Sequence, residues 1–243
     1  VASALTRRAL MSVTLTHYRT VLRRRFERQR RVALLLLAAA AGTVAAPACV
    51  PNTWLHTSGR WVGTSVSEAR FARLRTGVNL SRWFTRLPGD SADPDAVTGF
   101  VGASDFRRIR ALGFAHVRLP VDPERMFDER HPSRVEGPYL DALDRAIDSI
   151  LAADLAVIVD VHAHDGAPFK TRLATDDAHV RRVAQFLEAL ARHLATRDPE
   201  RVFLEVMNES EVHDRGRWDE VQATLLAAMR RGAPKHTLIA TGA

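Results

Sequence analysis

Five short apolar segments, separated by segments with helical periodicity, constrain the fold of this chain more than any other feature. Each apolar segment is bounded by polar residues or glycine, as buried strands are. Their first residues lie 38, 41, 47 and 34 positions apart, which suits a strand, a crossover helix and two loops. We therefore predict an α/β fold in which all five strands are parallel. The strands are expected at residues 76–80, 114–119, 155–161, 202–207 and 236–241.

The segments between the predicted strands place apolar side chains on one helical face. A stripe of Leu and Ile runs through residues 140–151, and Pro138 lies near the start of that helix. A shorter helix over residues 104–112 is expected to be capped by Ser104 and to end before Gly113. Two further helices are predicted over residues 180–194 and 218–229.

Two architectures produce this alternation, an open doubly wound sheet and a (β/α)8 barrel. No G-x-G-x-x-G or G-x-x-x-x-G-K-[ST] motif follows a predicted strand, so the nucleotide-binding open sheets lose their main support. We therefore predict a (β/α)8 TIM barrel. A complete barrel has eight strands in about 250 residues, so we expect the chain to be truncated after about the fifth strand, with roughly 100 residues missing.

The net charge of +7 is concentrated at the N-terminus. Residues 1–50 contain nine Arg and one acidic residue, Glu27, so the remaining residues carry 26 basic and 27 acidic side chains. Binding of nucleic acid needs a basic surface on a folded domain, and here the basic excess lies in a leader. We therefore expect no nucleic acid partner.

The same N-terminal region has the composition of a secretory signal. Residues 23–31 include six Arg, and the fifteen residues 32–46 carry no charge. A membrane-spanning helix needs about 20 apolar residues, so this run suits a signal cleaved near residues 46–48. We expect a secreted protein that contacts a membrane only through the leader. An uncleaved anchor and a lipid-modified Cys49 stay open as alternatives.

Composition also suggests how the chain is divided. Residues 50–75 show no sustained period and are typical of a linker. We expect a leader at residues 1–48, a linker at 49–74 and a partial barrel domain at 75–243. The single cysteine, Cys49, cannot form an internal disulfide, and we expect the protein to be monomeric.

Polar side chains follow or interrupt each of the first four predicted strands near its C-terminal end. In parallel barrels the reacting groups lie at this end of the strands. The residues placed there are Asn79, Arg118, His162 with His164, and Asn208 with Glu209. We interpret them as one candidate site.

Four sequence blocks resemble the successive strands of glycoside hydrolase family 5, the cellulase-like retaining glycosidases. They are GVNLSRWF at residues 77–84, DFRRIRALGFAHVRLPVD at 105–122, LAVIVDVHAHDG at 155–166 and VFLEVMNES at 202–210. The resemblance extends from about Arg75 to the end of the chain. The family usually has Pro where Ser210 stands, a backbone preference that leaves the assignment of the preceding residue intact.

The resemblance implies a role for each matched residue. Glu209 would be the general acid/base, which protonates the leaving oxygen and later activates water. Asn208 would hydrogen-bond the sugar 2-hydroxyl, and His162 would bind a hydroxyl at the cleavage site. Arg118 would orient the nucleophile and keep it ionised; a plain structural ion pair is its alternative role.

Other residues complete the expected site. Asn79 and Trp83 join the substrate-binding set, although Trp83 fits the core as well as a sugar platform. Glu205 is expected to be a buried, hydrogen-bonded structural acid. The family's nucleophilic glutamate lies on the seventh strand and has no match in this chain. Two carboxylates suffice for the chemistry, so no metal or cofactor is expected.

The sequence therefore predicts a retaining glycosidase fragment that acts on a β-linked polysaccharide, with β-1,4-glucan ahead of β-mannan or β-1,3-glucan. One rival is a metal-dependent amidohydrolase-type barrel, because His162 and His164 occupy alternate positions at a strand end. The other rival is a non-catalytic sugar-binding barrel.

Overall fold

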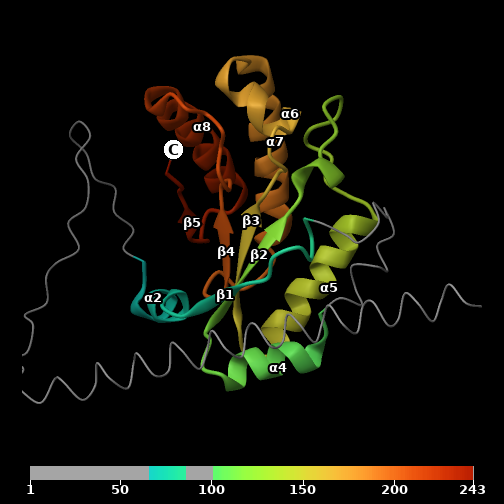
Figure 1. The fold of residues 1–243 in the computed structure, drawn as a ribbon, viewed down its shortest axis with the longest axis vertical. Coiled ribbons are helices and arrows are strands. Elements are labelled where there is room, and N and C mark those ends of the chain that lie inside the picture. The colour runs from blue at the N-terminus through green and yellow to red at the C-terminus, as the bar shows by residue number, and fades with distance from the viewer. Residues whose placement is uncertain (1–65, 86–100, 243) are drawn as a thin grey trace, which may run out of the picture. The chain divides into compact units, whose positions relative to one another are not determined.

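The computed structural model describes residues 66–85 and 101–242. Its five strands form one parallel sheet in the order β1-β2-β3-β4-β5, so each strand lies beside its neighbour in sequence (Figure 1). The predicted strands and their parallel arrangement are confirmed. Their bounds are β1 Gly77–Asn79, β2 His116–Val121, β3 Ala156–Val161, β4 Val202–Glu205 and β5 Leu238–Ile239.

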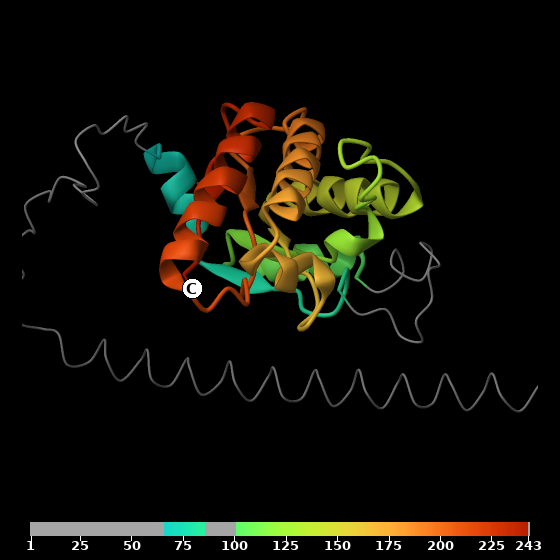
Figure 2. The ribbon, with the colours of Figure 1, turned by 90° about the horizontal axis from the view of Figure 1, so that it is seen from above.

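Long helices connect the strands, as a parallel sheet requires. Figure 2 shows three of them, α5, α7 and α8, on the same face of the sheet. Short helical turns lie in the loops that follow β2 and β3. The long helices are α4 Ala103–Ala111, α5 Pro138–Ala152, α7 Asp177–Leu194 and α8 Arg215–Gly232, and the short ones are η1 Pro123–Arg125, α6 Pro168–Thr171 and η2 Arg172–Ala174.

The start of α4 differs from the prediction by a small shift of its cap. Gly102, not Ser104, is the N-cap residue, and the Asp105 carboxylate accepts a hydrogen bond from the Gly102 N–H. Ser104 lies inside the helix because Asp105 supplies the capping interaction. The other end is as predicted: Gly113 has a φ of +91°, a conformation that favours glycine.

Alternate residues of the strands face two different environments. On β2 and β3, Val117, Leu119 and Val159 pack into the core beneath the helices. The opposite face has a smaller apolar cluster of Ala156, Ile158 and Phe203, on which Leu74 and Ile239 pack. Farther along the same face, toward the strands' C-terminal ends, the side chains are charged. This change from apolar to charged side chains defines where a site can form.

Part of the segment predicted as a linker is folded. Helix α2, Glu68–Leu74, belongs to the same compact unit as the sheet. Arg70 donates from Nε to Glu200 Oε1 at 2.7 Å and from Nη1 to the Lys235 carbonyl at 2.8 Å. Arg73 donates to the Asp154 carbonyl at 3.0 Å. This helix therefore packs against the sheet domain.

The predicted leader, its cleavage region and Cys49 lie outside the described residues. Within the two ranges that the structure describes, none of the helices combines the length and the apolar character needed to cross a membrane.

Candidate active site

Arg118 is the centre of the candidate site. Strand register places Asn79 beside Arg118 and Asp160 beside Glu205, at one edge of the sheet. The guanidinium donates to both Glu205 oxygens, at 2.7 Å from Nε and 2.6 Å from Nη2. It also lies 2.9 Å from Asp160 Oδ2 and donates to Asn79 Oδ1 at 3.1 Å and to Asn208 Oδ1 at 3.0 Å. One side chain thus links four strand ends.

Two buried carboxylates share this one guanidinium. Glu205 is 6% exposed and Asp160 is fully buried. Burial lowers the pKa of Arg118, but its hydrogen bond to Glu205 and the charges of Asp160, Glu205 and Glu209 outweigh burial and leave that pKa raised. Burial raises the pKa of Asp160, against the effect of its hydrogen bond with His162. The predicted burial and hydrogen bonding of Glu205 are confirmed.

Asp160 also fixes the orientation of His162. Asp160 Oδ2 lies 2.9 Å from His162 Nδ1, so the carboxylate favours the form in which Nδ1 carries the proton. His162 Nε2 has no hydrogen-bond partner among the described residues. The side chain is 30% exposed, and a hydroxyl group is a suitable partner for that nitrogen.

His162 and His164 contact different carboxylates. The nearest acid to His162 is Asp160, whereas His164 Nε2 lies 3.4 Å from Asp122 Oδ2. An amidohydrolase-type site needs both rings on one ion. Within the described ranges, no group of three His, Cys, Asp or Glu side chains is arranged to hold a metal. The geometry does not support that rival.

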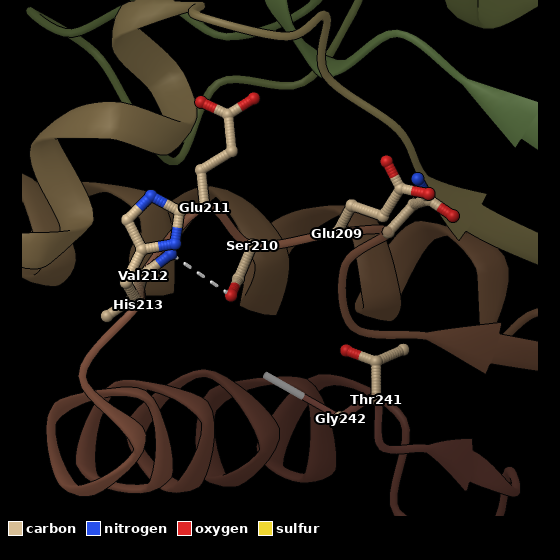
Figure 3. Close-up of a pocket in the computed structure, with 8 residues that line it drawn as sticks. Glu209, Ser210, Glu211, Val212, His213, Thr241 and Gly242 are labelled. Carbon is tan, nitrogen blue, oxygen red and sulfur yellow. Dashed lines mark hydrogen bonds between the residues drawn. The ribbon is translucent and has the colours of Figure 1, made fainter.

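Glu209 lies in a tight turn that follows β4. Its φ is +42°, and the φ of Glu211 is +58°. Non-glycine residues in this left-handed region cost on the order of 1–3 kcal/mol each and persist where the surroundings hold them. Such positions cluster at functional sites. Figure 3 shows the Glu209 and Glu211 side chains on one side of the turn and the Ser210 hydroxyl on the other.

A pocket of about 430 Å³ opens beside this turn. Its lining combines the turn residues with the loop that follows β5 (Figure 3). The pocket therefore brings the predicted acid together with the C-terminal ends of two strands. The lining residues are Asn208, Glu209, Ser210, Glu211, Val212, His213, Thr241 and Gly242.

Sequence reasoning missed the contacts that anchor this turn. Both carboxylate oxygens of Glu211 accept from the Gly166 N–H, at 3.0 and 3.1 Å. Glu211 Oε1 also lies 3.4 Å from Nζ of Lys170, whose side chain is fully buried. One feature of the sequence could have drawn attention to Lys170: it is one of only two lysines in an arginine-rich chain.

The prediction that Trp83 binds substrate is wrong in this structure. Trp83 is 2% exposed, and its ring packs against Phe84 and Phe106 at centroid distances of 5.0 and 5.7 Å. A sugar platform needs an exposed ring face. Trp83 therefore belongs to the core, which was its alternative role.

The fold matches several solved structures. Thermotoga maritima Cel5A in complex with cellobiose has a TM-score of 0.60 and 21% identity, over 71% of this chain and 53% of that one. The same enzyme in complex with mannotriose gives a TM-score of 0.59 and 20% identity, over 71% and 54%. Clostridioides difficile cellulose synthase subunit Z gives 0.55 and 20%, over 68% and 51%. The fold is therefore that of the TIM barrels, of which this sheet forms five strands.

Two curated relatives match in sequence. Endoglucanase 3 of Fibrobacter succinogenes is 22% identical over 192 residues, which cover 73% of this chain and 28% of that protein. Cellodextrinase A of Ruminococcus flavefaciens is 25% identical over 167 residues, which cover 65% and 47%. The chain thus spans less than half the length of either relative.

A match to the sequence model of a protein family assigns the chain to a family. The model described as cellulase (glycosyl hydrolase family 5) matches residues 90–243, which is more than half of the chain. The matched region contains β2 to β5, Arg118 with its partners Asp160, Glu205 and Asn208, and the Glu209 turn, whereas Asn79 lies before it. The chain belongs to glycosyl hydrolase family 5.

Proposed function

We propose that the protein containing this chain is a retaining glycosidase that hydrolyses a β-linked polysaccharide. The main support is the position of Glu209, which lines a pocket at the C-terminal ends of parallel strands, next to the Arg118 network. Active sites of barrel enzymes lie at this end of the strands. The family assignment adds the reaction class.

Glu209 is proposed as the general acid/base. It protonates the leaving oxygen in the first step and activates water in the second. The reaction also needs a nucleophilic carboxylate about 5–5.5 Å away. The seventh-strand glutamate that the resemblance implies has no counterpart on the five described strands. The nucleophile therefore stays unassigned.

Asn208 is proposed to bind the sugar 2-hydroxyl through its amide nitrogen. Arg118 occupies the Asn208 oxygen with a hydrogen bond of 3.0 Å. This contact leaves the NH2 group of Asn208 directed elsewhere, where it can donate to a hydroxyl oxygen. A hydrogen bond to the 2-hydroxyl strengthens in the transition state and lowers the barrier. Arg118 thus acts on substrate through Asn208.

We propose β-1,4-glucan as the preferred substrate and β-mannan as the second. The names of the two curated relatives, an endoglucanase and a cellodextrinase, support the first. Solved relatives in complex with cellobiose and with mannotriose support both. Secretion through the basic leader and a monomeric state are further proposals, which rest on the sequence.

The test replaces Glu209 by Gln in the full-length product of the gene that encodes these residues. We expect kcat on unactivated β-glucan to fall by about 10²–10⁴-fold, because the amide cannot donate the proton. The loss should be much smaller on an aryl β-glycoside with a good leaving group, which departs without a proton. Glu220→Gln, on an exposed part of α8, is the control.

Near-normal turnover of unactivated glucan by Glu209→Gln would reject this assignment. Binding of glucan without hydrolysis by the unsubstituted protein would instead favour the sugar-binding rival.

A further inference from the structure

We propose that Lys170 is a positioning residue for Glu209 and that it acts through Glu211. This inference rests on the proposed role of Glu209 as the acid/base. It concerns a contact between the loop that follows β3 and the turn that follows β4, both at the C-terminal end of the sheet.

Lys170 has few partners for a fully buried cation. Its Nζ lies 3.3 Å from Asp165 Oδ1 and 3.4 Å from Glu211 Oε1. The Asp165 side chain is 88% exposed, whereas that of Glu211 is 24% exposed. A buried charge needs a fixed partner, and an ion pair in water contributes little. Glu211 is therefore the partner on which the burial of Lys170 depends.

Glu211 in turn connects two loops. Its carboxylate accepts a hydrogen bond from the N–H of Gly166. The φ of Gly166 is +72°, which favours glycine at that position. Gly166 and Lys170 both lie after β3, whereas Glu211 lies after β4. The Lys170–Glu211–Gly166 group therefore holds the far end of the β4 turn against a different element.

The near end of the turn is held by another contact. Asn208 N–H donates to the Val161 carbonyl at 2.8 Å. Between these two anchors, Glu209 and Glu211 both have left-handed backbone conformations. Inside the turn, Val212 N–H lies 3.4 Å from Ser210 Oγ (Figure 3). Loss of the far anchor would let Glu209 relax toward an ordinary backbone conformation.

Such a relaxation would move the acid relative to the glycosidic oxygen. A displacement of about 1 Å can cost 10²-fold in rate. Substrate binding depends on other groups, so KM should change little. The defect should also resemble that of Glu209→Gln: large when the leaving group needs a proton, and small when it does not.

The experiment measures kcat and KM of Lys170→Met in the full-length gene product, on unactivated β-glucan and on an activated aryl β-glycoside. We expect kcat on glucan to fall about 10- to 100-fold with KM within about twofold, and a much smaller loss on the aryl glycoside. Lys170→Arg should recover part of the glucan activity. Amide hydrogen exchange at residues 209–212 should become faster in Lys170→Met.

Two controls separate positioning from stability. Asp144→Asn weakens a contact between α5 and α7, where Asp144 accepts from His193 and Arg197. It should lower the melting temperature and leave the ratio of the two activities unchanged. Lys235→Met makes the same substitution on the exposed second lysine and should change neither activity.

The outcomes distinguish this inference from the proposed function. Full activity of Glu209→Gln on glucan rejects the proposed function. The inference alone is overturned if Glu209→Gln loses activity while Lys170→Met keeps full activity, or loses activity equally on both substrates. If Lys170→Met does not fold, Glu211→Gln keeps the side-chain shape and removes the charge. It must then show the same leaving-group dependence, or the inference fails.

Discussion

At the residue scale, the candidate site contains more buried acidic groups than basic ones. One guanidinium, Arg118, faces the carboxylates of Asp160 and Glu205. Removing one member of such a group leaves a buried charge without its partner, which destabilises by about 3–5 kcal/mol. Asp160 Oδ1 has no hydrogen-bond partner among the described residues, and burial raises its pKa.

His116 gives a prediction about pH. It is 9% exposed, and its Nδ1 lies 2.9 Å from the Arg73 carbonyl. Burial lowers the pKa of His116, against the effect of this hydrogen bond. A depressed pKa means that the folded state binds the proton more weakly than the unfolded state. Stability is therefore complete above the unfolded value of about 6.5 and is lost as the pH falls through the folded pKa.

We expect His116→Asn to remove this part of the acid sensitivity, because its amide donates to the same carbonyl and does not titrate. The measurement is the free energy of unfolding at pH 7.5 and pH 5.0 for both proteins. The variant should lose less stability on acidification than the unsubstituted protein does. Equal losses in the two proteins would contradict the expectation.

At the element scale, apolar periodicity predicted the strands and helices well, and it could not predict the turn that carries the acid. Strands and helices follow from repeated patterns of burial, which many residues share. The left-handed conformations of Glu209 and Glu211 depend instead on contacts with Gly166 and Lys170, some 40 residues away. Trp83 was ambiguous for a similar reason, because only the neighbouring rings decide whether it is buried.

The packing of α7 against α8 gives a second prediction. At Gly232 a methyl group would lie 2.3 Å from the Glu188 carbonyl oxygen and 2.8 Å from the Arg192 nitrogen. Both are backbone atoms, so the helices must separate to admit it. We expect Gly232→Ala to destabilise the protein by about 1–3 kcal/mol.

The control is Gly216→Ala in the first turn of the same helix. There the nearest atom lies on the Asp214 side chain, at 3.3 Å from the added carbon. Alanine has the higher helix propensity, so this change should be neutral or slightly stabilising. Thermal or chemical unfolding measures both variants, and equal stability of the two would show that the helices are not in tight contact at Gly232.

At the scale of the whole molecule, the two faces of the sheet have different roles. Helices bury one face, and the other face changes from the apolar cluster of Ala156, Ile158 and Phe203 to charged residues at the strand ends. The sequence could place polar residues at these ends, because alternation along a strand is readable. It could not show that Arg118 links four of those ends, since distances between side chains on different strands do not follow from sequence spacing.

The arrangement of those charges also predicts how activity responds to chelators. His162 and His164 hydrogen-bond or ion-pair with separate acids, Asp160 and Asp122, and the proposed reaction uses two carboxylates. We expect EDTA or phenanthroline to leave glucan hydrolysis by the full-length gene product unchanged, and elemental analysis to find less than stoichiometric zinc. A metal that shared both rings would have to break both contacts, and its removal would abolish turnover. Activity lost to the chelator and restored by zinc would therefore reject the two-carboxylate mechanism and favour the amidohydrolase-type site.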